Sequence, residues 1–440
     1  MQPYDNPQEK RGDNLQPAVI GIIILLLCVV LFLTEWLPSA VTGCLGCALM
    51  VLFGVCSFED AFGGFSDSIV ILMASAMIVG IAMFQTGAAQ LTGRMVIRLA
   101  HGRERLFLFI SCLTAGILSM FLANTAILAS FFPIIDSVCS VSPLMKRRNL
   151  VLPVACSVML GGACTLIGCT PQLTANGILS QLTGQQMGMW DLTGPGLCLF
   201  ALYLLYLMTA GYPLGERIWG HRSEDEMEID TEETHSVLHA SYDKKKLTIM
   251  LIITILMIAS YILSLLPIAM TALCAALLCI ITGCCSTRDI VHKLHWETIV
   301  FLASCLGLAN ALTVSGSGEL IGQAVSSILG GISSPFVIFA ILVALALFIS
   351  QFITNSTAII IVLPIALSLC SAYGFHTMPF CIGITLAASA ACCTPLAAAQ
   401  IAMTEVAGYE FSDYIKYCLP PTFLFLAGIL IFVPLFFPLQ

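Results

Sequence analysis

Long apolar runs, separated by short polar stretches, follow one another from residue 18 to the C-terminal end of the chain. Each run holds about 20 residues, the length that a helix needs to cross roughly 30 Å of hydrocarbon. The runs are continuous rather than alternating, so they predict helices and not the strands of a β-barrel. Composition agrees, because 59% of the 440 residues are hydrophobic and 10% are charged, too few polar groups to cover a soluble globule. The pattern therefore predicts an all-α, multi-pass integral protein of the cell (cytoplasmic) membrane.

The chain carries an internal repeat. Residues 37–60 match residues 266–289 without a gap. Farther along, Ser119 and Asn124 recur as Ser350 and Asn355, and a proline follows each asparagine at the same distance. The Cys-Thr-Pro sequence at 169–171 also resembles the one at 393–395. Matches in a common order at near-constant separation indicate a duplication, as in transporters built from two related halves.

The basic residues predict how the two halves lie in the membrane, because short loops rich in Lys and Arg stay in the cytoplasm. Such residues flank the first asparagine segment on both sides, whereas residues 315–378, around the second, contain none. The first segment is therefore expected to enter from the cytoplasm and return as a re-entrant hairpin. The second is expected to enter from outside. An odd number of crossings in each half would invert the second half relative to the first.

Each half is predicted to hold five crossings and one hairpin. The first inverted repeat is residues 1–213, with a hairpin at about 104–143 and a broken helix at about 150–180. The second is residues 247–440, with a hairpin at about 334–373 and a broken helix at about 377–404. An acidic cytoplasmic linker, 214–246, would join them, and both termini would be extracytoplasmic. The predicted crossings are 18–36, 39–56, 69–87, 150–180 and 195–213, then 247–266, 268–285, 298–314, 377–404 and 416–438.

The two hairpin tips and the two breaks are the predicted binding site. A hairpin that stops within the bilayer survives only if its tip is buried in protein or lines a wet cavity. The second arm begins at each asparagine, so its free N–H groups favour an anion. Proline disfavours helix just before it, which predicts unwinding at 168–171 and 392–395. Freed carbonyls, with the Ser119 and Ser350 hydroxyls, are oxygen ligands suited to a hard cation such as sodium.

These residues resemble the divalent anion:sodium symporter family of the ion transporter superfamily, which carries dicarboxylates, citrate and sulfate. That family has a Ser-Asn-Thr motif at each tip, and the counterparts here are Ala123-Asn124-Thr125 and Thr354-Asn355-Ser356. Ala123 lacks the expected hydroxyl, and Gln172 stands where the family has Asn in its unwound segment. The family has no obligatory Lys or Arg at the substrate, and this sequence shows none near either tip.

The resemblance implies a role for each site residue and a mechanism. Hairpins and broken helices would form a mobile transport domain that moves against a dimeric scaffold, an elevator mechanism. A homodimer in membrane lipid is therefore expected. The implied substrate ligands are Asn124, Thr125, Thr170, Asn355, Ser356, Thr394 and Pro395. The implied cation ligands are Ser119, Asn124, Gly168, Ser350, Thr354, Asn355 and Cys393.

The expected function is secondary active transport of a small divalent anion, above all a C4-dicarboxylate, driven by sodium. A sulfate or citrate carrier is the near alternative. An arsenite or sodium/proton antiporter would need an essential buried acid, and Asp136, Glu297 and Glu405 favour structural roles. An enzyme is not expected, because the apolar region offers no nucleophile–base pair or metal cluster. No cofactor, nucleic-acid partner or metal other than sodium is predicted.

Two further groups of residues are interpreted as structural. His292 and His295 lie in a short basic loop without acidic or cysteine partners, which favours solvated side chains over metal ligands. The twenty cysteines lie mostly singly within apolar runs, without Cys-x-x-Cys spacing. They are interpreted as small apolar packing residues.

Overall fold

The computed structural model describes residues 7–34, 36–87, 103–141, 145–219, 244–317, 320, 334–395 and 398–440. Throughout these ranges the regular elements are helices, without a strand, which confirms the all-α prediction. The helices of the first half are α1 (Pro7–Thr34), α2 (Ser39–Leu52), α3 (Phe58–Phe62), η1 (Gly63–Ser66), α4 (Ser68–Gln85), α6 (Glu104–Ser119), α7 (Asn124–Val141), α8 (Arg147–Gly162), α9 (Thr170–Thr183), α10 (Thr193–Tyr206), η2 (Leu207–Gly211) and α11 (Tyr212–Trp219).

The second half repeats much of this order. Its helices are α13 (Lys244–Leu263), α14 (Ile268–Ile281), α15 (Thr287–Lys293), α16 (Trp296–Val314), α18 (Pro335–Ile349), α19 (Asn355–Tyr373), α20 (Thr377–Ser389), α21 (Ala399–Ala402), η3 (Met403–Ala407) and α22 (Phe411–Phe436). Most of the predicted linker 214–246 lies outside the described residues, but its two ends belong to α11 and α13.

Six stretches of helix among the described residues are long and apolar enough to cross a membrane. Several shorter apolar helices accompany them, so the chain is a multi-pass membrane protein. The number of crossings in each half and their orientation stay predictions. The six stretches are Phe58–Gln85, Thr193–Trp219, Lys244–Leu263, Trp296–Val314, Asn355–Tyr373 and Phe411–Phe436.

The sequence repeat recurs as repeated local geometry. Pro38 and Pro267 precede α2 and α14 with nearly the same dihedral angles, φ −52°, ψ 140° and φ −53°, ψ 144°. Each of these helices is followed by a glycine with positive φ, +68° at Gly54 and +71° at Gly283, a conformation that glycine adopts without strain. A serine then caps the next short helix in each half, accepting a 3.1 Å bond from an aspartate N–H three residues on. These pairs support the predicted duplication.

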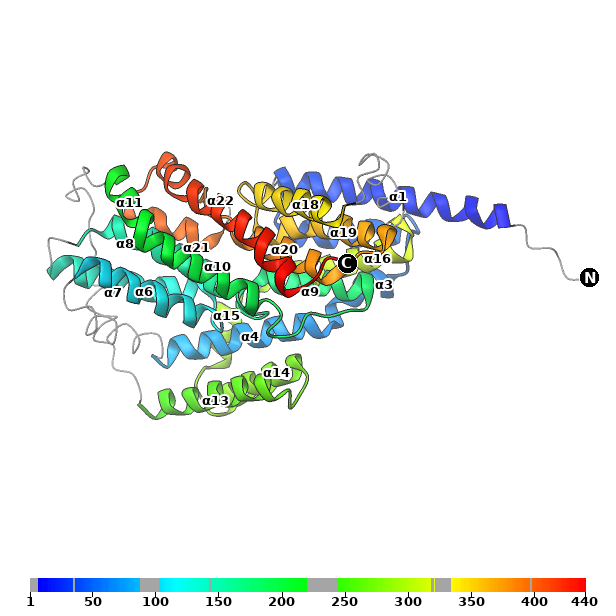
Figure 1. Ribbon diagram of the computed structural model, residues 1–440. Helices are drawn as coiled ribbons and strands as arrows, with labels where there is room; N and C mark the ends of the chain where they lie inside the picture. The colour runs from blue at the N-terminus through cyan, green and yellow to red at the C-terminus, as the bar shows by residue number, and fades with distance from the viewer. Residues whose placement is uncertain are drawn as a thin grey trace, which may run out of the picture.

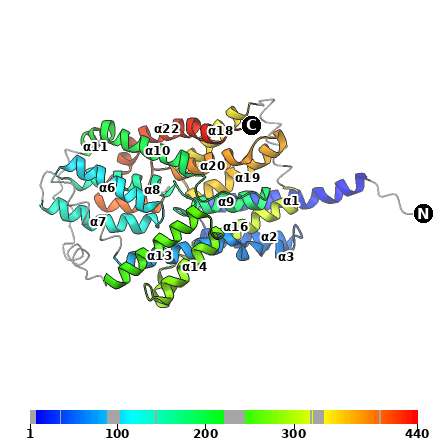
Figure 2. The ribbon, with the colours of Figure 1, turned by 60° about the horizontal axis from the view of Figure 1, so that its bottom comes forward.

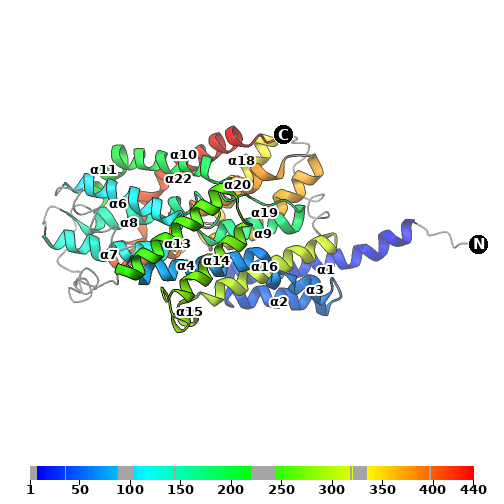
Figure 3. The ribbon, with the colours of Figure 1, turned by 90° about the horizontal axis from the view of Figure 1, so that it is seen from below.

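The helices form two bodies, each built from both halves of the chain. The first body contains α1 to α4 with α13 to α16, where α16 packs on α2 and α14 packs on α4. The second body contains α6 to α11 with α18 to α22, where α6 packs on α8 and α19 packs on α9 and α20. Figures 2 and 3 show α1 to α4 and α13 to α16 gathered along one side of the molecule. Helix α9 makes the main contacts between the bodies, against α16 and α4.

The two predicted hairpins are helix pairs of the second body at opposite ends of the molecule. Figure 1 places α6 and α7 at the left end and α18 and α19 toward the right end. Each pair turns within four or five residues, 120–123 and 350–354. The face of the membrane from which each hairpin enters stays a prediction.

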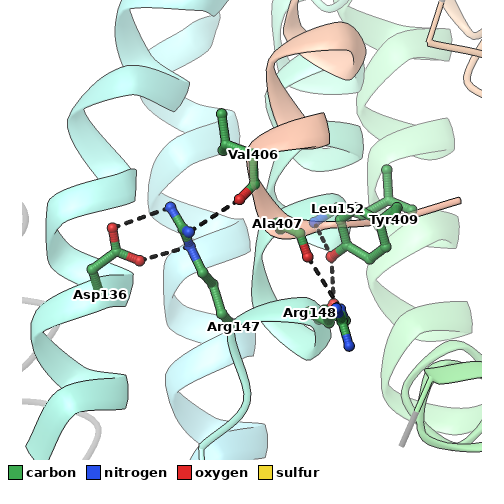
Figure 4. A network of polar contacts seen from close by, with 7 residues as sticks. All are labelled: Asp136, Arg147, Arg148, Leu152, Val406, Ala407 and Tyr409. Atoms are coloured by element: carbon green, nitrogen blue, oxygen red, sulfur yellow. Dashed lines mark hydrogen bonds and ion pairs between the residues drawn. The ribbon is translucent and has the colours of Figure 1, made fainter. Parts of the chain in front are cut away.

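Charged residues join the two halves within the second body (Figure 4). The Asp136 carboxylate on α7 pairs with the Arg147 guanidinium at 2.8 Å, and Arg147 also donates to the Val406 carbonyl at 3.1 Å. Arg148 Nε donates to the Ala407 carbonyl, also at 3.1 Å. Asp136 is thus held in a buried ion pair, which supports its structural interpretation over a proton-carrying one.

Candidate functional site

Both asparagines begin the second arm of a hairpin and are held by the same kind of bond. Asn124 is the first residue of α7, and Asn355 is the first residue of α19. The Ser119 hydroxyl donates to Asn124 Oδ1 at 2.5 Å, and the Ser350 hydroxyl donates to Asn355 Oδ1 at 3.0 Å. Each asparagine is 8% exposed. The serines thereby fix the orientation of two nearly buried amides.

The two tips meet at one cavity of about 560 Å³. Its walls come from both hairpin tips, from the starts of α9 and α21, and from α4 and α16 of the first body. The cavity therefore lies where the two bodies face each other. Its lining includes Met77, Gly80, Phe84, Ala123, Asn124, Thr125, Gly168, Cys169, Thr170, Pro171, Thr298, Phe301, Thr354, Asn355, Ser356, Ala398, Ala399 and Gln400.

The helix breaks predicted at the two Thr-Pro sequences are present. Helix α8 ends at Gly162 and α9 begins at Thr170, while α20 ends at Ser389 and α21 begins at Ala399. Both gaps follow long buried helices of the second body. The second break contains the segment 392–395 in which unwinding is predicted. The first break lies earlier than the predicted segment 168–171, because Thr170 and Pro171 already belong to α9.

The correspondence predicted between the two breaks is wrong by five residues. Thr165 and Thr394 occupy equivalent places, because each hydroxyl donates to the carbonyl of the residue after the hairpin serine, Met120 or Gln351. Cys169 and Ala398 are equivalent in turn, since both are extended residues before a helix, with φ −142° and −152°. The two Thr-Pro pairs therefore lie at positions that are not equivalent in the two halves. Pro171 occupies the first turn of α9, where a missing N–H costs little, whereas Pro395 lies in the break itself.

Seven of the predicted ligands line the cavity: Asn124, Thr125, Gly168, Thr170, Thr354, Asn355 and Ser356. The other predicted ligands are not in the described lining. Ser119 and Ser350 are fully buried behind the asparagines. The Cys393 thiol lies 3.2 Å from the Thr422 hydroxyl on α22, and the Thr394 hydroxyl is bonded to Gln351. Cys393, Thr394 and Pro395 therefore do not face the cavity in this conformation.

Sequence reasoning missed Gln400. This side chain is 7% exposed and lines the cavity from the start of α21. It lies 229 positions after Pro171, the same separation that relates residues 37–60 to 266–289. Aligning the two breaks with this separation of 229 positions would have placed Gln400 beside the first tip's counterpart.

Sequence reasoning also missed charged groups on the opposite wall. Lys293, His295 and Glu297, from the connection between α15 and α16, line the same cavity as the tips. The expectation of no basic side chain near the site is therefore wrong for the cavity as a whole. Lys293 Nζ lies 3.7 Å from Asp289 Oδ1. The Ser286 hydroxyl and Lys293 lower the pKa of Asp289, which keeps this carboxylate ionised beside the lysine.

Comparison with known proteins identifies the family. The citrate transporter family (CitMHS) matches residues 29–357, three quarters of the chain. The chain belongs to this family. An uncharacterized transporter of Synechocystis is 29% identical over 199 residues, which cover 45% of this chain and 32% of that protein. The chain thus spans about a third of the length of that relative.

Two further likenesses cover most of the chain. The sodium-dependent dicarboxylate transporter SdcS of Staphylococcus saprophyticus is 21% identical over 424 residues, covering 87% of this chain and 79% of SdcS. The YdaH transporter of Alcanivorax borkumensis has the same fold, with a TM-score of 0.63 at 13% identity over 95% of this chain and 98% of YdaH. The chain thereby has the family and the fold of membrane transporters.

Cys169 gives a direct test of the cavity. Its thiol accepts a 2.9 Å bond from Asn124 Nδ2, and among the described cysteines it is the one in the lining. A charged, membrane-impermeant methanethiosulfonate is expected to inactivate transport by adding bulk beside Asn124. Cys169→Ser should keep transport and resist the reagent, measured as residual uptake in vesicles treated from either side. Equal inactivation of Cys169→Ser would contradict the assignment of this cavity to the transport path.

Proposed function

We propose that this chain is a secondary active transporter that carries a small divalent anion, above all a C4-dicarboxylate, coupled to sodium. The observation that carries the proposal is the convergence of two equivalent tips, at Asn124 and Asn355, on one cavity between two bodies. The likeness to SdcS, a sodium-dependent dicarboxylate transporter, supports the substrate class and the ion.

The chemistry of the cavity suits an anion. Helices α7 and α19 begin at the tips, so their N-terminal ends carry partial positive charge toward the cavity. Amide and hydroxyl groups from Asn124, Thr125, Asn355 and Ser356 add donors. Lys293 and His295 add basic groups on the facing wall. Two carboxylates of one solute could thus be held by the two tips at once.

Sodium is proposed at the Ser–Asn pairs. Each pair places a hydroxyl and an amide oxygen at hydrogen-bond distance, and rotation of the hydroxyl proton would free both oxygens for a hard cation. The second tip has one more oxygen, since Thr354 Oγ1 caps α19 and lies 2.7 Å from Thr357 Oγ1. Ala123 offers no such group. The second cation site is therefore proposed to be the stronger one.

Movement of the second body against the first is the proposed transport step. The hairpins, breaks and tips all belong to the second body, while the first body supplies the wall with Lys293 and His295. Contacts between the bodies run mainly through α9 against α16 and α4, so these are the contacts that would change as the bodies move. The first body would be the scaffold and, by the family resemblance, the dimer interface.

Citrate is a second candidate, favoured by the family to which the chain belongs. Its third carboxylate would need a further positive group, and Lys293 or His295 could supply one. An antiporter with an essential buried acid is less favoured, because Asp136 is paired with Arg147 and Glu297 is exposed.

Uptake into proteoliposomes tests the proposal. Labelled succinate, citrate and sulfate are each supplied with and without an inward sodium gradient. Succinate uptake that rises several-fold with the gradient is the expected result, and citrate should compete with it. Failure of all three anions to enter would overturn the anion proposal. Succinate uptake that is the same with and without the gradient would overturn sodium coupling alone.

A further inference from the structure

Three cysteines from separate elements converge in the core of the second body. Cys156 lies on α8, Cys392 in the break between α20 and α21, and Cys418 on α22. All three are 0% exposed. Their sulfur atoms all lie within 4.8 Å of one another. This cluster is distinct from the cavity, whose described lining includes none of the three.

Two tyrosines lie on helices at the cluster. The Tyr206 and Tyr417 hydroxyl oxygens are buried and lack a hydrogen-bond partner among the described residues. Tyr206 is the last residue of α10, which packs on α8 and α22, and Tyr417 precedes Cys418 on α22. Tyr417 is 1% exposed. A buried hydroxyl without a partner loses free energy, about 1–3 kcal/mol, so two of them beside one thiol cluster call for an explanation.

We infer that Cys156, Cys392 and Cys418 form a binding site for a thiophilic d10 metal ion, Cu⁺ or Zn²⁺. Soft sulfur ligands select these ions over magnesium, calcium or sodium. With metal–sulfur bonds of about 2.3 Å, three coplanar ligands would stand about 4 Å apart. The thiols must therefore approach by less than about 1 Å. Three protein ligands without a fourth favour Cu⁺, because structural Zn²⁺ sites take four.

The charge balance gives the tyrosines their role. Cu⁺ bound by two thiolates and one thiol, with release of two protons, has a net charge of −1, as has Zn²⁺ bound by three thiolates with release of three. A buried charge of this kind is costly unless hydrogen bonds compensate it. The Tyr206 and Tyr417 hydroxyls, which lack a partner among the described residues, are proposed to turn toward the sulfurs and donate to them when the ion binds. Such outer hydrogen bonds orient metal ligands and strengthen binding.

The site would tie together three elements, of which the break and α22 already share a weak contact of 3.7 Å between the Cys392 thiol and the Thr422 hydroxyl. Cys392 belongs to the break after α20, next to Cys393, which contacts Thr422 on α22. A metal at Cys392 would fasten this irregular segment to α8 and α22. The bound ion is therefore expected to stabilise the second body.

Metal binding by the full chain tests the inference. The reduced, detergent-purified protein is equilibrated with Cu⁺ buffered by bicinchoninate, or with Zn²⁺, then desalted and analysed for metal. For at least one of the two ions, the wild type is expected to retain about one equivalent per chain that is missing from Cys156→Ser and from Cys418→Ser. Cys305→Ser, which removes a buried thiol of the first body, should retain as much as the wild type. That ion should also raise the thermal unfolding midpoint of the wild type but not of the two serine variants.

Tyr206→Phe covers the case in which a serine variant does not fold. It removes one hydroxyl and leaves all three thiols, and should lower the affinity for the ion at least about tenfold. Equal metal retention by the wild type and the Cys156 and Cys418 variants would overturn the site, as would absence of both ions from the wild type. Unchanged affinity in Tyr206→Phe would overturn the role of the tyrosine.

Discussion

Alanine in place of Asn355 or of Asn124 is expected to reduce substrate uptake to background while the protein still inserts and folds. Each amide lines the cavity and is oriented by a serine hydroxyl. A hydrogen bond to a charged group contributes about 1.5–3 kcal/mol, so loss of one amide should weaken anion binding by about 10- to 100-fold. Loss of the amide oxygen also removes a proposed cation ligand. The measurement is initial uptake rate in proteoliposomes, with binding followed by thermal shift.

Asn310→Ala is the matched control for both variants. This asparagine donates to the Asp60 carbonyl at 3.0 Å within the first body and is absent from the described lining. Its loss should lower stability somewhat and leave the substrate affinity unchanged. Wild-type uptake by either tip variant would refute the assignment of that asparagine. Sodium-dependent thermal stabilisation should be lost less in Asn124→Ala than in Asn355→Ala, because the Asn124 tip has fewer oxygens.

Gly162→Ala is expected to lower uptake about tenfold or more without touching the ligands chemically. A Cβ atom at this position would lie 2.4 Å from Asn124 Oδ1 and 2.7 Å from the Cys169 sulfur. Ordinary contact needs about 3.4 Å or more, so the amide must move by about 1 Å. Such a displacement breaks the shared geometry of Asn124, Ser119 and Cys169. The measurement is the concentration dependence of uptake, in which apparent affinity should fall.

Gly63→Ala controls for the general effect of adding a methyl group to a glycine. A Cβ atom there would meet nothing within 4 Å, and its φ of −57° suits alanine. Its uptake should match that of the wild type. If Gly162→Ala also transports like the wild type, the close approach between α8 and the first tip has no part in binding.

The hairpin tips could be predicted because their signals are local. A serine and an asparagine five residues apart, with a proline at fixed distance, occur twice in an otherwise apolar chain. The helix breaks were less visible, because a proline removes a donor without always ending a helix. Pro395 lies in its break, but Pro171 lies in the first turn of α9. Other prolines lie inside continuous helices, among them Pro133, Pro153 and Pro364. The ends of α2 and α14 are marked in the sequence by the equivalent glycines Gly54 and Gly283. These features depend on backbone geometry that few residues can adopt.

The partners of the tips could not be predicted with the same success. Gln400 belongs to no recognisable motif. The repeated Cys-Thr-Pro sequence suggested that Thr394 corresponds to Thr170, which left Gln400 out of the predicted site. Lys293 and His295 reach the cavity only because α15 and α16 pack beside α4, a tertiary contact that no local pattern encodes. The pairing of Asp136 with Arg147 likewise brings together two helices, α7 and α8. Where packing of separate segments decides a position, sequence pattern alone leaves it open.

The interleaving of the two halves has a consequence for the ancestry of the chain. Neither body belongs to one half, since α16 covers α2 in the first body and α19 covers α9 in the second. A polypeptide consisting of one half alone would leave both of these faces uncovered in lipid or water. It could bury them only against a second copy of itself. Under the predicted inversion of the second half, that copy would run the opposite way through the bilayer, the present chain would be a fused antiparallel pair, and Ala123 and Thr354 would record how far two once-identical tips have diverged.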